Sequence, residues 1–167
     1  MFLSLLRIPM KWIEFILPGI MVWLTQLLLV DFLSINTVRP DFLIILVLYW
    51  SIKHGKSVGT LSGFIIGLSV DLSGTASFFG LSPLIYTITG YLGGYLHGSY
   101  LKLNPIYFTL AWVGIISLHF LIFSVVQYQE IWNVNPSLFW MKWIATTLYT
   151  LSFIGILQVI YPMHKLV

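Results

Sequence analysis

The chain is divided into six apolar segments by short polar or proline-containing stretches, and this pattern constrains its fold more than any other feature. The segments run from Trp12 to Val30, Pro40 to Ile52, Ser57 to Val70, Pro83 to Leu96, Pro105 to Val126 and Pro136 to Tyr161. About 20 residues of helix cross a hydrocarbon core of ~30 Å, and the segments lack the alternation typical of membrane strands. The sequence therefore predicts an all-α integral membrane protein, a single domain over residues 1–167 with six transmembrane helices.

Composition excludes the main alternatives. Of 167 residues, 59% are hydrophobic and 8% charged, whereas a soluble domain carries about 25% charged residues. Aromatic residues make up 17%, which is far too many for a disordered chain. The eight Lys and Arg residues are scattered, so they form no basic patch for nucleic acid. Because cysteine is absent, the chain has neither disulfides nor a thiolate metal site.

Prolines mark four of the segment starts, and three of these prolines follow a capping residue. Ser82-Pro83, Asn104-Pro105 and Asn135-Pro136 each place a capping residue before a proline, an arrangement typical of the first helical position. These pairs predict that helices begin at Pro83, Pro105 and Pro136.

The second and third segments are short for a crossing, since 13 or 14 residues reach only about 20 Å as a helix. They extend through their polar neighbours Arg39, Asp41 and Asp71, or the bilayer thins around them, or they form a re-entrant pair. Extension is favoured, because it places Asp41 in a first turn, where the positive end of the helix dipole stabilises a carboxylate.

The distribution of basic residues predicts the orientation. With six crossings and a cytoplasmic N-terminus, the cytoplasmic side receives Arg7, Lys11, Lys53, Lys56, Lys102 and Lys165. The outer side receives only Arg39 and Lys142 among the basic residues. Both termini are therefore predicted to be cytoplasmic.

Glycines recur every four residues on the third segment. Gly55, Gly59, Gly63 and Gly67 are followed at the same spacing by Asp71, and Gly90, Gly94 and Gly98 form a second row in line with Tyr86. Residues four apart lie one turn apart on a helix, and rows of small residues let helix backbones approach closely in lipid. The rows predict helix packing within the chain, with docking of a partner's transmembrane helix as the alternative.

Several polar residues lie within or beside these segments. Asp71 is expected to cap its helix end by accepting N–H groups from Ser73-Gly74, with a partner or ligand contact as the alternative. Arg39 and Asp41 are expected to pair with each other or with Asp71. These three residues form the polar set predicted at the outer ends of segments two and three.

His119 is a lone intramembrane histidine, and we expect it to make an interhelical hydrogen bond. Metal binding or proton relay would need further ligands or acids, and none lies three or four residues away. Gln26 is likewise expected to make a polar contact within the bundle. Gly67-Leu68-Ser69 matches an intramembrane serine protease over three residues, with His119 as the candidate base. This match is too short to predict an enzyme, and no metal or phosphate-binding motif occurs.

The order and spacing of motifs between Arg39 and Gly98 resemble one known family. The motifs are Arg39-Pro40-Asp41-Phe42-Leu43, Tyr49-Trp50, Gly63-Phe64-Ile65-Ile66-Gly67-Leu68, Asp71-Leu72-Ser73-Gly74, Phe79-Gly80-Leu81 and Tyr86-Thr87-Ile88-Thr89-Gly90-Tyr91-Leu92. The ordered set resembles the rod shape-determining protein MreD family of the bacterial inner membrane. The motifs cover about the central third of the chain, while its length and segment count agree throughout.

The resemblance implies a six-helix fold similar to the S-component of energy-coupling-factor transporters, with no catalytic activity and no cofactor. It implies a place in the rod complex, which inserts peptidoglycan along the side wall. The implied partner is MreC, a single-span protein, and through it MreB, RodA and the transpeptidase partner of RodA.

The residues and the resemblance together predict a non-catalytic scaffold that binds MreC. The residues predicted for partner binding are Arg39, Asp41, Gly59, Gly63, Gly67 and Asp71, and those predicted for helix packing are Gly90, Gly94 and Gly98. The alternative is a small-molecule-binding subunit of a transporter, which would need polar groups around a central cavity.

Overall fold

A computed structural model of the chain describes residues 13–35, 38–73, 78–100 and 104–163. Within these ranges the elements are α1 (Ile13–Leu29), α2 (Phe42–His54), α3 (Lys56–Leu72), α4 (Leu81–Gly93), the 3-10 helix η1 (Gly94–Leu96), α5 (Pro105–Gln127), α6 (Gln129–Val134) and α7 (Pro136–Ile160). The prediction of an all-helical protein is confirmed over these ranges. The short helix α6 was not predicted.

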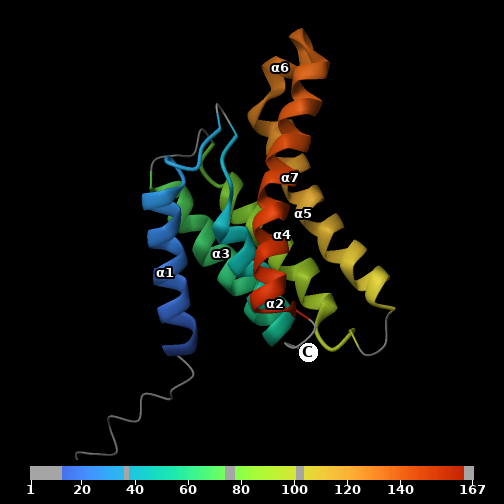
Figure 1. Ribbon diagram of the computed structural model, residues 1–167. Coiled ribbons are helices and arrows are strands. Elements are labelled where there is room, and N and C mark those ends of the chain that lie inside the picture. The colour runs from blue at the N-terminus through green and yellow to red at the C-terminus, as the bar shows by residue number, and fades with distance from the viewer. Residues whose placement is uncertain (1–12, 36–37, 74–77, 101–103, 164–167) are drawn as a thin grey trace, which may run out of the picture.

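The long helices run alternately up and down through one bundle (Figure 1). The start of α1, the loop from α2 to α3 and the end of α7 lie at the lower end in this view, and α6 lies at the upper end. Each of the six predicted segments corresponds to one of the helices α1, α2, α3, α4, α5 and α7. Of the predicted cytoplasmic cations, Lys53 lies in the last turn of α2 and Lys56 begins α3, on either side of the loop at the lower end. Arg7, Lys11, Lys102 and Lys165 lie outside the described residues.

Within the part of the chain that the structure describes, α5 and α7 are the helices both long and apolar enough to cross a membrane. Phe15–Leu29 and Phe42–His54 are shorter apolar helices. Residues with large apolar side chains cover much of the outside of the bundle, with exposed fractions of 74% at Leu28 on α1 and 86% at Val159 on α7. Such surfaces suit a lipid environment. Six crossings remain a prediction.

Helix α2 lies at the centre of the hydrophobic core. All residues from Leu43 to Leu48 are buried, and α2 packs against α1, α3, α4 and η1. A helix that is apolar all round is one surrounded by other elements. Protein therefore covers much of this short helix.

The predicted extension of the two short segments is confirmed for one of them. Helix α3 continues through Asp71 to Leu72. Helix α2 begins only at Phe42, so Arg39 and Asp41 precede the helix, and it extends instead at its other end to His54. Asp41 is the N-cap residue rather than a member of the first turn, because its extended backbone and its side chain satisfy the first helical N–H groups.

Two of the three predicted helix starts are confirmed. The side chain of Asn104 accepts the N–H of Ile106 at 3.1 Å, and that of Asn135 accepts the N–H of Leu138 at 3.2 Å. The prediction was wrong for Ser82, because α4 begins at Leu81 with Gly80 as its N-cap. Gly80 has φ 94°, a conformation that glycine adopts without steric cost.

The glycine row of α3 packs directly onto α4. A Cβ atom on Gly59 would collide with the carbonyl of Gly90, one on Gly63 with the carbonyl of Tyr86, and one on Gly67 with the backbone of Pro83. All three α3 glycines are buried. The predicted role of this row in packing within the chain is therefore confirmed, and α4 is the helix that fills it.

The second row is only partly a packing row. A Cβ atom on Gly90 would meet the carbonyl of Gly59, and one on Gly94 would meet the backbone of Lys56. Gly98 was predicted to extend this row, and the structure contradicts that prediction. It lies beyond η1 with φ 66°, and a Cβ atom there would have nothing within 4 Å. Its role is that of a turn residue, because the helix ends before it.

Candidate functional site

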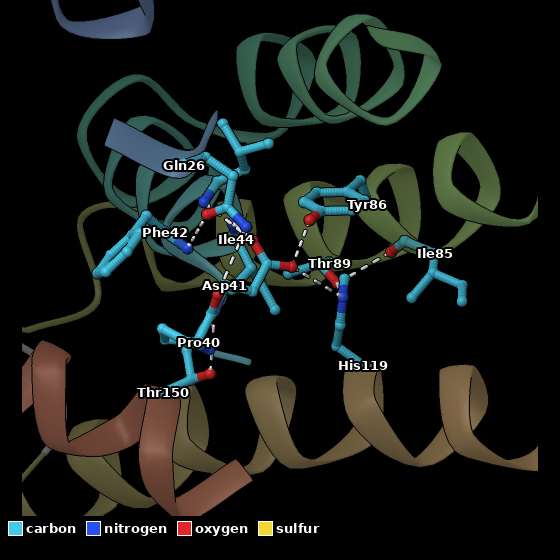
Figure 2. A network of polar contacts seen from close by, with 11 residues as sticks. Gln26, Pro40, Asp41, Phe42, Ile44, Ile85, Tyr86, Thr89, His119 and Thr150 are labelled. Atoms are coloured by element: carbon cyan, nitrogen blue, oxygen red, sulfur yellow. Dashed lines mark hydrogen bonds and ion pairs between the residues drawn. The ribbon is translucent and has the colours of Figure 1, made fainter. Parts of the chain in front are cut away.

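The N-terminus of α2 is capped by Asp41. One carboxylate oxygen, Oδ1, accepts the N–H groups of Leu43 at 2.9 Å and Ile44 at 3.1 Å. These are backbone donors that a helix leaves unpaired at its start. The cap fixes the carboxylate in place and leaves its other oxygen, Oδ2, facing α4 and α5 (Figure 2).

Side chains of α1 and α7 make hydrogen bonds to the backbone of the turn that contains Asp41. Gln26 on α1 accepts the N–H of Phe42 at 2.8 Å and donates to the carbonyl of Pro40 at 3.4 Å. Thr150 on α7 accepts the N–H of Asp41 at 3.3 Å. The polar contact predicted for Gln26 is therefore confirmed. Because buried backbone groups are costly when unpaired, these contacts fix the position of the Asp41 turn within the bundle.

Helices α4 and α5 supply the groups that face Oδ2. Tyr86 on α4 donates its hydroxyl hydrogen bond to Oδ2 of Asp41. His119 on α5 places Nε2 at 4.0 Å from the same oxygen, and its Nδ1 lies 2.8 Å from Oγ1 of Thr89 on α4. The interhelical hydrogen bond predicted for His119 is confirmed by this contact with Thr89. We refer to Asp41, Tyr86, Thr89 and His119 as the polar cluster.

A cavity of about 330 Å³ lies beside the polar cluster, and Asp41, Tyr86 and His119 contribute to its wall. The rest of the wall is largely aromatic and aliphatic and includes Trp23 and Phe120. The lining residues come from the helix ends that lie at the upper end of the bundle. A concave, mostly apolar site with a few convergent polar groups is the usual form of a small-molecule site.

The mouth of the cavity carries a charge pair. Arg39 and Asp31 form an ion pair of 3.3 Å, and both side chains are mostly exposed. The prediction that Arg39 pairs with Asp41 or Asp71 was wrong, because Asp41 is turned inward by its cap. Tyr128 also lines the cavity, and burial raises the pKa of its phenol. The phenol therefore stays neutral and can donate or accept a hydrogen bond.

Asp71 lies near this end of α3 but makes a separate contact. Its Oδ2 accepts the N–H of Gly80 at 2.5 Å, which joins the end of α3 to the start of α4. Its other oxygen, Oδ1, is buried and has no hydrogen-bond partner among the residues that the structure describes. Of the two predicted donors, Ser73 uses its N–H for carbonyls of α3, and Gly74 lies outside the described residues. The predicted contact with Asp71 is therefore made by the N–H of Gly80 and not by that of Ser73.

The predicted residues separate into two groups in space. Gly59, Gly63 and Gly67 pack against the backbone of α4, while Arg39 and Asp41 line the cavity. Sequence reasoning did not predict that Tyr86, Thr89 and Thr150 join Asp41. The available signal was their polarity within apolar helices, because polar groups inside a membrane face protein and pair there.

Ser69 and His119, the nucleophile and base of the serine-protease match, make hydrogen bonds to other groups. Ser69 donates its hydroxyl to the carbonyl of Ile66 at 2.7 Å, while His119 bonds to Thr89. Within the ranges that the structure describes, no three His, Asp or Glu side chains gather as potential metal ligands.

Comparison with known proteins gives the family. Residues 6–166 match the family model described as rod shape-determining protein MreD. No curated protein and no solved structure matches the chain. The family match covers essentially the whole sequence, including the segments in which no motif was recognised. The chain therefore belongs to the MreD family of rod shape-determining proteins.

Proposed function

We propose that this protein is a non-catalytic scaffold of the rod complex in the bacterial inner membrane. It binds MreC, and through MreC it supports peptidoglycan synthesis by RodA and its transpeptidase partner along MreB filaments. The observation that carries this proposal is the match of residues 6–166 to a family described as shape-determining. In this proposal the protein acts by binding a partner and not by catalysing a reaction.

The proposed topology has six crossings with both termini in the cytoplasm. Its support is the alternation of the helices in Figure 1, together with the position of Lys53 and Lys56 at the same end as the start of α1. Basic residues near helix ends favour the cytoplasmic side. In this orientation, the cavity and the Arg39–Asp31 pair face the outer side of the membrane.

The proposed MreC surface includes the outer-end residues Arg39, Asp41 and Asp71. Arg39 is exposed, so it is available to a partner, and the Asp71 carboxylate has an oxygen that no described residue pairs. The glycines Gly59, Gly63 and Gly67 already pack on α4. Their proposed contribution to partner binding is therefore indirect, because they fix the α3–α4 pair that carries Asp71.

Complementation in rod-shaped cells tests the proposal. We expect this chain, co-expressed with its MreC, to restore rod shape to cells depleted of their own MreD. Arg39→Glu is expected to reduce rescue while the protein still accumulates in the membrane. Asp31→Asn serves as a control, since it also breaks the ion pair but leaves the Arg39 cation. Full rescue by Arg39→Glu would remove Arg39 from the proposed surface, and failure of the wild-type chain to restore shape would contradict the scaffold itself.

A transporter subunit similar to the energy-coupling-factor S-component is the second candidate, and the cavity is the observation that favours it. This candidate predicts that a small molecule co-purifies with the protein and that cells take it up in a manner that depends on the chain. A scaffold predicts a co-purifying single-span protein and no uptake that depends on the chain.

A further inference from the structure

The hydrogen bonds of Thr89 determine which nitrogen of His119 carries the proton. Oγ1 of Thr89 donates to the carbonyl of Ile85 at 2.9 Å, so its single hydrogen is in use. The contact of 2.8 Å with Nδ1 of His119 must then be donated by the imidazole. In the neutral ring this leaves Nε2 as an acceptor, and Nε2 is the atom directed toward Asp41.

Two acceptors therefore face each other beside the cavity. Nε2 of His119 and Oδ2 of Asp41 are 4.0 Å apart, which is beyond hydrogen-bond reach. The His119 side chain is only 3% exposed, so bulk water does not serve it as it would on a surface. A donor atom at roughly 2.8 Å from both acceptors has a normal hydrogen-bond geometry. The cavity is the space from which such a donor can enter.

The charges of the cavity wall favour a cation. Among the charged lining residues, Arg39 is paired with Asp31, which leaves the carboxylate of Asp41 without a cationic partner. A carboxylate without a counter-ion at membrane depth is costly. The aromatic rings of Trp23, Phe120 and Tyr86 line the same space, and aromatic faces attract ammonium groups.

We propose that the cavity binds a small organic cation, with a primary ammonium donating to Asp41 Oδ2 and His119 Nε2 and an apolar body lying among the aromatic rings. A volume of about 330 Å³ is at the lower end of ligand sites, so the ligand is a compact amine rather than a lipid. The site shares Asp41 with the proposed MreC surface, and its test with probe amines does not depend on MreC. It gives the scaffold a ligand-sensing end on the outer side of the membrane.

Binding of matched probes to the purified full-length protein in nanodiscs tests this site. Primary amines from ethylamine to phenethylamine are compared with the alcohols of the same carbon skeletons, by calorimetry and by thermal shift. We expect phenethylamine to bind at least tenfold more tightly than 2-phenylethanol. Equal binding of amine and alcohol, or no binding by any amine in the series, would overturn the proposal.

A variant pair separates the site from general charge effects. Asp41→Asn keeps an effective N-cap and is expected to weaken phenethylamine binding at least tenfold. Glu130→Gln removes one negative charge from the exposed helix α6, outside the lining of the cavity, and is expected to change that binding less than twofold. If Asp41→Asn is folded, as judged by its thermal transition, and binds the amine like the wild type, the assignment to Asp41 is wrong.

Discussion

Tyr86 contacts both Gly63 and Asp41. Its backbone carbonyl lies where a Cβ atom on Gly63 would stand, and its hydroxyl donates to the carboxylate of Asp41. One residue thus joins the glycine row of α3 to the polar cluster at the start of α2. The close approach of α3 and α4 therefore sets the position of a group in the cavity wall.

Replacement of Gly63 by leucine is expected to separate α3 from α4. The added side chain would overlap backbone atoms of Tyr86 and Thr87, and overpacking of this kind costs about 1–3 kcal/mol or more. We expect a large drop in the thermal transition of the purified protein. Gly114→Leu is the matched control, because a Cβ atom at Gly114 meets nothing within 4 Å. Equal destabilisation by both variants would contradict the packing role of Gly63.

Removal of the Asp41 carboxylate tests the cap separately from the charge. Asp41→Ala removes the acceptor of the Leu43 and Ile44 N–H groups, and loss of an N-cap costs about 1 kcal/mol. Asp41→Asn retains an acceptor, so its thermal transition is expected to lie above that of Asp41→Ala. If the two variants melt at the same temperature, the cap contributes nothing measurable.

Asp71 is expected to stabilise the α3–α4 hairpin through Gly80. Asp71→Ala leaves the Gly80 N–H without its acceptor, and loss of a hydrogen bond of this kind costs about 1 kcal/mol. Asp31→Ala removes an aspartate that is mostly exposed, and an exposed ion pair contributes about 0–1 kcal/mol. Thermal unfolding in one detergent is expected to rank Asp71→Ala as the less stable variant, and the opposite ranking would contradict the Gly80 contact.

Single cysteines test the proposed topology, because the chain has none of its own. An impermeant thiol reagent added to intact cells is expected to label a cysteine at Ser34, which follows α1, or at Asn133 on α6, the helix at the upper end in Figure 1, but not one at Ser99, which follows η1. Permeabilised cells provide the control, in which the cysteine at Ser99 also reacts. The reverse pattern in intact cells would invert the proposed orientation.

The sequence predicted what local spacing determines. The four-residue repeat of Gly59, Gly63 and Gly67 was enough to predict a packing face, since helical period alone places these residues together. The identity of the facing helix depends on tertiary structure. Likewise, the Asn–Pro pairs predicted two helix starts, but the Ser82-Pro83 pair did not, because Gly80 reverses the chain two residues earlier.

The polar cluster could not be assembled from the sequence, because its members belong to helices that are distant along the chain. Asp41 and Tyr86 are 45 positions apart, and no periodicity links them. Arg39, two residues before Asp41, suggested a local ion pair, but the Asp41 carboxylate caps α2 while Arg39 pairs with Asp31. Polarity within apolar segments marked Gln26 and His119 as inward-facing, and only the packing of the helices showed which groups they meet.

Co-purification tests the scaffold most directly. The full-length chain, carrying an affinity tag, is isolated in mild detergent from rod-shaped bacterial membranes that also contain its MreC. We predict that MreC is recovered in a fixed ratio to the chain, and that Gly114→Leu retains this ratio while Gly63→Leu loses it. Recovery of a folded, monodisperse protein without MreC would contradict the central claim that this protein works by binding a membrane partner.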